Sequence, residues 1–262
     1  MVNFDCKEHY KFPDLVEIIR LLRSPGGCPW DREQTHRSIR RNLLEEAYEA
    51  AEAIDTEDAG LLCEELGDVL MQVVFHARIE EEAGGFDIDA VSDGICKKLI
   101  ERHPHVFGSV CVSGSDEVLV NWDQIKRKEK GQATTASAMD SVARSLPSLW
   151  RAEKIQSKAA KVGFDWPDVS GALDKLREET EELHAAAGGE GDPREELGDL
   201  LFSAVNTARF LKIDPEEALN EACEKFITRF RHVEAAAEQA GKPLSSMTLA
   251  EMDLLWDEAK QS

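Results

Sequence analysis

The sequence predicts an all-helical protein made of two copies of one acidic module. Of its 262 residues, 42 % are hydrophobic and 32 % are charged, but only 6 % are aromatic, and such a composition favours helices over sheets. Apolar side chains recur at helical spacing within residues 43–54 and 62–77. Short motifs from the first half of the chain return in the second half in the same order, which indicates a duplication.

The repeat is clearest at two acidic motifs and one tryptophan motif. The matched pairs are Glu-Glu-Ala-Tyr-Glu at 45–49 with Glu-Glu-Thr-Glu-Glu at 178–182, Glu-Glu-Leu-Gly-Asp at 64–68 with the same five residues at 195–199, and Trp-Asp at 122–123 with Trp-Asp at 256–257. Two copies indicate a duplicated domain, because a solenoid needs three or more stacked units. We therefore predict an N-terminal domain at 1–130 and a C-terminal domain at 142–262. Residues 131–141 between them are mostly small and polar without an apolar period, which is typical of a flexible linker.

Each copy is predicted to contain an antiparallel hairpin of two amphipathic helices. In the first copy, residues 56–58 supply an N-cap candidate for the second helix, and Gly84-Gly85 ends it. In the second copy, the glycine-rich segment 188–193 separates the two helices. A third helix follows in each copy, and Pro104 should end it early in the first.

Carboxylates at a spacing of three residues predict a cation site on each hairpin. Residues three apart share one face of a helix, so Glu46 lies beside Glu49, and Glu65 lies beside Asp68. Four carboxylates in one small volume repel one another unless a hard cation such as Mg²⁺ lies among them. A solvated acidic face is the usual alternative for a single motif, but here both motifs recur with the same flanks. The glycine inside each Glu-Glu-Leu-Gly-Asp motif indicates a close approach of another backbone.

Glu-x-x-Glu followed by Glu-x-x-Asp resembles the pattern of the MazG-type nucleoside triphosphate pyrophosphohydrolases, and both copies carry it. Residues 28–31, 103–108 and 162–166 also look like stretches of the two-domain bacterial members. The resemblance implies tandem all-α, MazG-like helical-bundle domains that hydrolyse ribo- and deoxynucleoside triphosphates to the monophosphate and pyrophosphate. It also implies dependence on Mg²⁺, with Mn²⁺ as an alternative, a homodimer, and a role in nucleotide-pool control or house-cleaning.

By position, the resemblance assigns metal binding to four carboxylates in each copy and nucleotide contacts to four residues of the second copy. The metal-binding residues are Glu46, Glu49, Glu65 and Asp68 in the N-terminal copy, and Glu179, Glu182, Glu196 and Asp199 in the C-terminal copy. The nucleotide-contacting residues are Lys175, Lys225, Arg229 and Trp256. Glu178 and Glu195 each adjoin a metal-binding position. They are candidate catalytic residues, either as the base that accepts a proton or as groups that orient the ligands.

The chemistry of the nucleotide-contacting residues agrees with these roles. Lys225 and Arg229 lie one turn apart on the predicted third helix, so both can reach triphosphate oxygens, although ordinary surface charge is the alternative. Trp256 offers a flat face for a base or serves as a packing anchor. Lys175 has Asn42 as its counterpart in the first copy. We therefore expect the principal active site in the C-terminal domain, while the N-terminal copy retains activity or serves dimerisation or regulation.

Two other classes of protein share parts of this pattern. A ferritin-like di-iron bundle also uses carboxylates from four helices, but it adds a His three residues after a Glu. Positions 49, 68, 182 and 199 hold only Glu or Asp, which disfavours that class. A non-catalytic acidic helical scaffold is the second alternative, and binding of a nucleotide with Mg²⁺ would distinguish the enzyme from it.

Charge and hydropathy limit the partners and the location. The formal net charge of -21 disfavours binding to nucleic acid, because phosphates are repelled at long range. No run approaches the ~18 apolar residues that a membrane span needs, and the polar N-terminus lacks the order of a secretory signal. We therefore expect a cytoplasmic protein that binds NTP and dNTP substrates and has neither nucleic acid nor membrane as a partner.

Overall fold

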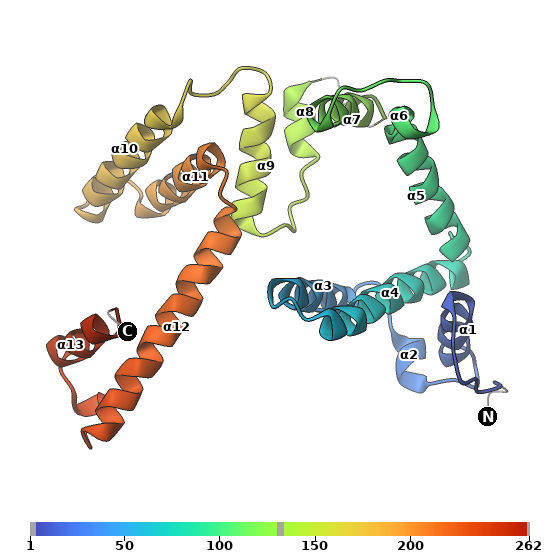
Figure 1. The fold of residues 1–262 in the computed structure, drawn as a ribbon, viewed down its shortest axis with the longest axis horizontal. Helices are drawn as coiled ribbons and strands as arrows, with labels where there is room; N and C mark the ends of the chain where they lie inside the picture. Colours follow the sequence, from blue (N-terminus) through green and yellow to red (C-terminus); the bar gives the residue numbers. More distant parts are fainter. Residues whose placement is uncertain (1–3, 130–133, 261–262) are drawn as a thin grey trace. The chain divides into compact units, whose positions relative to one another are not determined.

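The computed structural model describes residues 4–129 and 134–260, and within these ranges it contains helices and turns but no strand (Figure 1). The predicted all-α fold is confirmed. The chain divides into two compact units, Met1–Lys126 and Arg127–Ser262. None of the described helices is both long enough and apolar enough to cross a membrane.

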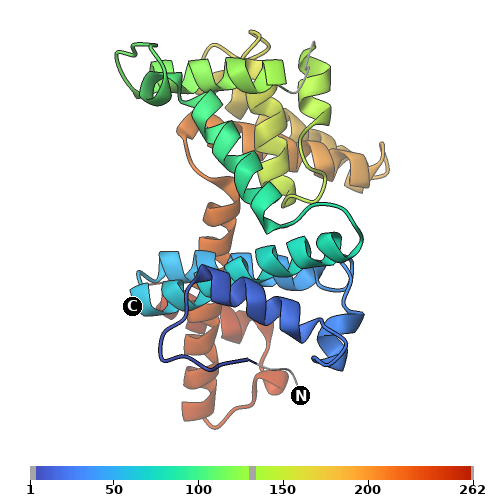
Figure 2. The same cartoon turned by 90° about the vertical axis from the view of Figure 1, so that its right-hand side faces the viewer.

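The N-terminal unit is built on a hairpin of two long helices. Its helices are α1 (Phe12–Leu22), α2 (Pro29–Glu33), α3 (Arg40–Asp55), α4 (Ala59–Glu82), α5 (Ile88–Arg102), α6 (Pro104–Phe107) and α7 (Ser115–Glu129), the last of which crosses the boundary of the unit. The hairpin consists of α3 and α4, and α1 packs against α4, as both views show (Figures 1 and 2). The buried core of the unit contains Ile19, Ile39, Val74 and Phe75.

Local sequence signals set the ends of these helices. Asp58 caps α4 by accepting hydrogen bonds from the backbone N–H groups of Gly60 at 2.9 Å and Leu61 at 3.0 Å. Gly84 follows α4 with a φ of 77°, a left-handed conformation that glycine adopts without strain. Pro104 begins α6 after a single intervening residue, His103, so that α5 has 15 residues whereas α12 has 25. The predicted N-cap, glycine stop and early end of the third helix are thus confirmed.

A buried arginine connects several elements of the N-terminal unit. The side chain of Arg23, which directly follows α1, is 5 % exposed, and its Nη2 lies 2.8 Å from Glu82 Oε2 on α4. Its Nη1 donates to the carbonyl oxygens of Asp31 at 2.5 Å and Gln34 at 3.2 Å, and its guanidinium lies 5.1 Å from the centre of the Phe75 ring. One cation therefore satisfies a carboxylate and two backbone acceptors at once.

The C-terminal unit repeats the hairpin and extends it with a long helix. Its elements are α8 (Thr135–Asp140), α9 (Ser148–Ala160), α10 (Val169–Ala187), α11 (Pro193–Leu211), α12 (Pro215–Gln239), the short 3-10 helix η1 (Leu244–Ser246) and α13 (Leu249–Ala259). The hairpin consists of α10 and α11, while α9 packs on both α11 and α12. Trp150 Nε1 donates to Asp214 Oδ1 at 2.8 Å, which ties α9 to the N-cap of α12.

The prediction of a flexible linker at 131–141 was wrong over much of that segment. Residues 131–133 lie outside the described residues, but α8 occupies most of the remainder. Thr134 caps α8 and forms a reciprocal capping box with Ser137. Ala138 is 1 % exposed, because α8 packs on α9. A local cap and one buried alanine thus turn small, polar residues into a short docked helix.

The prediction of close backbone approach at the motif glycines was also wrong within the described part of the chain. A Cβ atom added at Gly67 or Gly198 would meet no atom within 4 Å. The neighbouring leucines, Leu66 and Leu197, are 52 % and 48 % exposed. This side of each hairpin is therefore open, because none of the described helices covers the glycine.

Candidate active site

Three of the four carboxylates predicted to bind metal in the second copy lie close together in its hairpin. Glu179 comes from α10, and Glu196 and Asp199 come from neighbouring turns of α11. One oxygen of each carboxylate lies within 4.8 Å of the other two. Glu179 is 4 % exposed, whereas Asp199 is exposed. The cluster therefore reaches from a buried position on the hairpin to its surface.

Glu182, the fourth predicted metal-binding residue of this copy, lies beside the cluster and not within the three-residue group. Burial raises the pKa of the Glu182 carboxyl, and a hydrogen bond with Glu179 together with the charge of Glu179 raises it further. Glu182 therefore binds a proton more readily than an isolated carboxyl group would.

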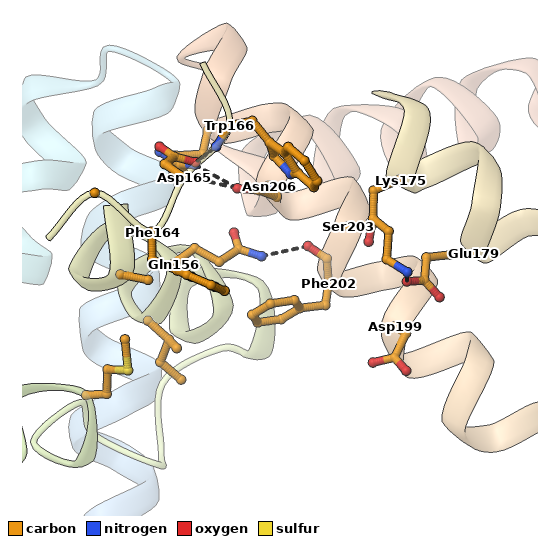
Figure 3. Close-up of a pocket in the computed structure, with 15 residues that line it drawn as sticks. Gln156, Phe164, Asp165, Trp166, Lys175, Glu179, Asp199, Phe202, Ser203 and Asn206 are labelled. Carbon is orange, nitrogen blue, oxygen red and sulfur yellow. Dashed lines mark hydrogen bonds and ion pairs between the residues drawn. The ribbon is translucent and has the colours of Figure 1, made fainter. Parts of the chain in front are cut away.

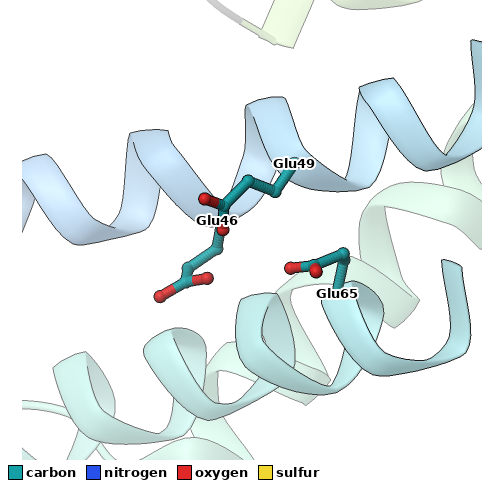
Figure 4. Close-up of side chains that lie close together, drawn as sticks. All are labelled: Glu46, Glu49 and Glu65. Atoms are coloured by element: carbon teal, nitrogen blue, oxygen red, sulfur yellow. The ribbon is translucent and has the colours of Figure 1, made fainter. Parts of the chain in front are cut away.

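The first hairpin holds a matching cluster. Glu46 and Glu49 on α3 face Glu65 on α4 (Figure 4), and one oxygen of each lies within 4.8 Å of the other two. Burial is the largest cause that raises the pKa of Glu46 and of Glu65, and the negative charges of Asp68 and Glu49 add to it. Asp68 therefore acts electrostatically on this cluster, although it is outside the three-residue group.

Lys175 distinguishes the two clusters. Its Nζ lies 2.7 Å from Glu179 Oε1 and 2.8 Å from Glu178 Oε1. Hydrogen bonds to Glu178 and Glu179 raise the pKa of Lys175 above its ordinary value, so it stays a cation. The corresponding residue of the first copy is the uncharged Asn42. The second cluster thus has a lysine ion-paired with one of its members, Glu179, which offsets part of its negative charge.

The donor atoms of both clusters fit a hard divalent cation. All of them are carboxylate oxygens, which Mg²⁺ prefers, whereas Zn²⁺ and copper sites usually include nitrogen or sulfur. Oxygens on opposite sides of a bound Mg²⁺ are about 4.2 Å apart, twice the usual Mg–O distance. A separation of at most 4.8 Å therefore needs only small side-chain movements to match this geometry.

A cavity of about 700 Å³ adjoins the cluster of the C-terminal unit. Its lining consists of Met139, Ile155, Gln156, Ala159, Gly163, Phe164, Asp165, Trp166, Lys175, Glu179, Asp199, Phe202, Ser203, Asn206 and Arg209. Lys175, Glu179 and Asp199 gather on one side, and the aromatic rings and amides occupy the other (Figure 3). The sequence motifs missed the second group, whose only signal was the run of aromatic residues within 162–166.

The other predicted nucleotide-contacting residues lie on the long helix and after it. Lys225 and Arg229 belong to α12, and Trp256 belongs to α13. The Arg229 guanidinium is 5.9 Å from the centre of the Trp256 ring. The centres of the Phe226 and Trp256 rings are 4.9 Å apart. Trp256 on α13 therefore packs against two residues of α12. None of the three predicted residues belongs to the lining of the cavity, so their contact with a nucleotide stays a prediction.

The raised carboxyl pKa values predict that stabilisation by Mg²⁺ depends on pH. Folding raises the pKa values of Glu46, Glu65 and Glu182. Protonation of these carboxyls therefore stabilises the folded protein at a pH below their pKa in the unfolded chain, and this stabilisation is lost as the pH rises through their pKa in the folded protein. A bound cation replaces those protons. We expect the rise in Tm on adding Mg²⁺ to be largest at neutral pH and to shrink towards about pH 5. Thermal unfolding at several pH values, with and without chelator, measures this, and an equal rise at pH 5 and pH 7 would contradict it.

Each unit carries a cluster of carboxylate oxygens on a helical hairpin, and in the C-terminal unit the cluster adjoins a cavity with a lysine at its charged side. These features define a class of helical-hairpin proteins with an acidic cluster in each repeat. A family model described as the MazG nucleotide pyrophosphohydrolase domain matches residues 34–107 and 169–234. Each match contains one of the two hairpins. The chain therefore belongs to the MazG family of nucleotide pyrophosphohydrolases and is an enzyme of that class, which confirms the resemblance of the motifs.

Several relatives match nearly the whole chain. The chain is 46 % identical over 252 residues to the "Nucleoside triphosphate pyrophosphohydrolase/pyrophosphatase MazG" of Thermotoga maritima, with 95 % of each protein covered. It is 44 % identical over 252 residues to the "Nucleoside triphosphate pyrophosphohydrolase" of Escherichia coli K12, with 94 % of this chain and 96 % of that protein covered. The "Uncharacterized protein YabN" of Bacillus subtilis is 49 % identical over 257 residues, which are 97 % of this chain and 52 % of that protein.

Proposed function

We propose that this enzyme hydrolyses ribo- and deoxynucleoside triphosphates to the nucleoside monophosphate and pyrophosphate with Mg²⁺, principally in its C-terminal unit. The observation that carries the proposal is the position of the Glu179, Glu196 and Asp199 cluster at the edge of the cavity. Two relatives that match over nearly their whole length are named nucleoside triphosphate pyrophosphohydrolases. The N-terminal unit retains activity of its own or serves dimerisation or regulation.

The residues of the cluster have distinct tasks in this reaction. Glu179, Glu196 and Asp199 would hold the cation, with Glu182 as a further ligand. When bound, Mg²⁺ (or Mn²⁺) neutralises charge on the phosphate oxygens and lowers the pKa of water. Lys175, held at the cluster by its ion pair with Glu179, supplies a fixed positive charge for the triphosphate.

The acceptor of the proton from the attacking water is one of two neighbouring carboxylates. Glu178 is ion-paired with Lys175 at 2.8 Å, so its carboxylate is already engaged by a cation. Glu195 lies on the first turn of α11, is exposed, and precedes Glu196 directly. We therefore favour Glu195 as the base and Glu178 as a group that orients Lys175.

The proposal includes a homodimer, further nucleotide contacts and a place in the cell. On α11, Leu197 and Leu201 are 48 % and 50 % exposed, and a second copy would cover this apolar side of the hairpin. Lys225, Arg229 and Trp256 are retained as nucleotide-contacting residues. A cytoplasmic enzyme of this kind would act in nucleotide-pool control or house-cleaning.

Product analysis with the full-length protein tests the proposed reaction. With ATP or dATP and Mg²⁺, we expect phosphorus NMR to show equal amounts of monophosphate and pyrophosphate, and we expect a chelator of divalent cations to abolish both. Mn²⁺ should restore the reaction after chelation. Release of the diphosphate and inorganic phosphate would contradict the proposal, and so would an absence of turnover with every divalent cation, which would favour the scaffold alternative.

A further inference from the structure

The cavity of the C-terminal unit has two chemically different sides (Figure 3). Lys175, Glu179 and Asp199 make one side charged. The other side combines aromatic rings and uncharged amides with the ion pair of Asp165 and Arg209. The rings and amides are those of Gln156, Phe164, Trp166, Phe202 and Asn206. A nucleoside triphosphate has the same two parts, a highly charged triphosphate and a flat base whose edge carries hydrogen-bond donors and acceptors. With the triphosphate at the cluster, the aromatic side is where the base would lie.

Gln156 presents an unused hydrogen-bond acceptor on this side. The residue lies on α9, is 7 % exposed, and donates from Nε2 to the backbone carbonyl of Phe202 at 2.7 Å. That carbonyl fixes the orientation of the amide, because a flipped amide would place Oε1 against another acceptor. Oε1 is buried and has no hydrogen-bond partner among the described residues. Buried acceptors without a donor are rare in folded proteins, so a donor on a ligand would complete this site.

Asn206 supplies the complementary donor. Its Oδ1 accepts hydrogen bonds from Arg209 Nε at 3.1 Å and Nη2 at 2.8 Å, and Arg209 is itself held by Asp165 Oδ1 at 2.5 Å. Because these bonds fix the oxygen of the Asn206 amide, the group that it can offer a ligand is its N–H donor. The aromatic side thus provides one acceptor and one donor, both held by neighbouring residues.

The aromatic wall is positioned by a glycine. Trp166 lies so close to α10 that a Cβ atom at Gly171 would come within 2.8 Å of Cδ2 and Cε3 of its ring. Glycine therefore lets the indole lie against the helix backbone. Trp166 is still 47 % exposed and Phe164 is 83 % exposed, which leaves aromatic surface available for stacking on a base.

We propose that Gln156 is a specificity-determining residue of this site, and that its Oε1 accepts a hydrogen bond from the exocyclic amino group of an adenine or cytosine base. Asn206 donates to the ring nitrogen beside that amino group, and Trp166 packs on the base. The inference rests on the proposed function and names its preferred substrates, the amino-bearing nucleoside triphosphates. A base with a carbonyl at that position sets one acceptor against another and is disfavoured.

Matched pairs of nucleotides test this inference with the full-length protein and Mg²⁺. ATP is compared with purine riboside triphosphate, in which hydrogen replaces the amino group, and CTP is compared with its 4-deamino analogue. In the wild type, we expect kcat/KM to be about tenfold higher for the amino-bearing nucleotide of at least one pair, as one hydrogen bond allows. In Gln156→Met, which keeps the length of the side chain but has no amide, the ratio should fall to about one. The ratio compares two substrates of one preparation, so partial misfolding does not change it.

Two further variants separate recognition from a general effect on the fold. Gln156→Glu in its protonated form donates to the Phe202 carbonyl and keeps an acceptor, so the preference for the amino group should return as the pH is lowered. Gln34→Met removes a glutamine that also donates to a backbone carbonyl, that of Trp30 at 2.8 Å, but lies in the N-terminal unit, and it should leave the ratio unchanged.

The outcomes distinguish this inference from the proposed function. Pyrophosphate release with no amino preference in either pair would overturn the role of Gln156 alone. A preference that persists in Gln156→Met would do the same. If the wild type releases pyrophosphate from no nucleotide, the proposed function fails and the inference fails with it.

Discussion

Replacement of Glu196 by glutamine is expected to lower the rate of pyrophosphate release by about three powers of ten, since a catalytic metal ion contributes several kcal/mol of transition-state stabilisation and each 1.4 kcal/mol is a factor of ten. Glu196→Gln keeps the shape of the side chain but removes one negative charge from the Glu179, Glu196 and Asp199 cluster. The concentration of Mg²⁺ needed for half-maximal activity should rise as well. Steady-state rates across a Mg²⁺ titration measure both effects.

The matched control is Glu65→Gln, because Glu65 occupies the corresponding position of the first cluster. If the C-terminal unit holds the principal active site, this variant should keep most of the activity. Equal losses in the two variants would show that both clusters contribute to turnover. Full activity in Glu196→Gln would contradict the assignment of the C-terminal cluster as the metal site of the reaction.

The largest expected effect on stability comes from Arg23→Met in the N-terminal unit. The change leaves the backbone carbonyls of Asp31 and Gln34 without the arginine donor and removes a charge partner of Glu82. These contacts are shielded from water, because the Arg23 side chain is only 5 % exposed. We expect a loss of about 3 kcal/mol, typical of breaking a buried charged hydrogen-bond network. This corresponds to a fall of roughly 10 °C in Tm for a unit of this size. Calorimetry of the full-length protein measures it, with hydrogen exchange to assign the transition.

Arg20→Met is the control for that prediction, because it removes an arginine from the same part of the chain. Arg20 pairs with Glu17 one turn away, and their side chains are 48 % and 42 % exposed. Exposed ion pairs contribute about 0–1 kcal/mol, so the Tm should change little. If Arg20→Met lowered the Tm as much as Arg23→Met does, the loss of any positive charge in this region would explain both results, and the buried network of Arg23 would have no special role.

Local signals in the sequence predicted the two hairpins, the helix that follows each of them and the acidic pairs. Asp58 and Gly84 mark the start and the end of α4, because capping depends on residues within one turn of a helix end. The prediction of a flexible linker failed at α8 because one local signal was overlooked and one non-local contact could not be predicted. The cap at Thr134 was readable from the sequence, but the burial of Ala138 depends on packing against α9, which spacing along one segment does not reveal.

The sequence by itself determined the duplication, the two hairpins, the family and which carboxylates share one helix face, since residues three apart on a helix are neighbours whatever the helix packs against. Only the tertiary structure decided that Glu179 joins Glu196 and Asp199 while Glu182 lies beside them, and that Gln156 faces the same cavity. Those relations join different helices. They depend on the offset and angle at which α9, α10 and α11 pack, which no periodicity within one helix contains.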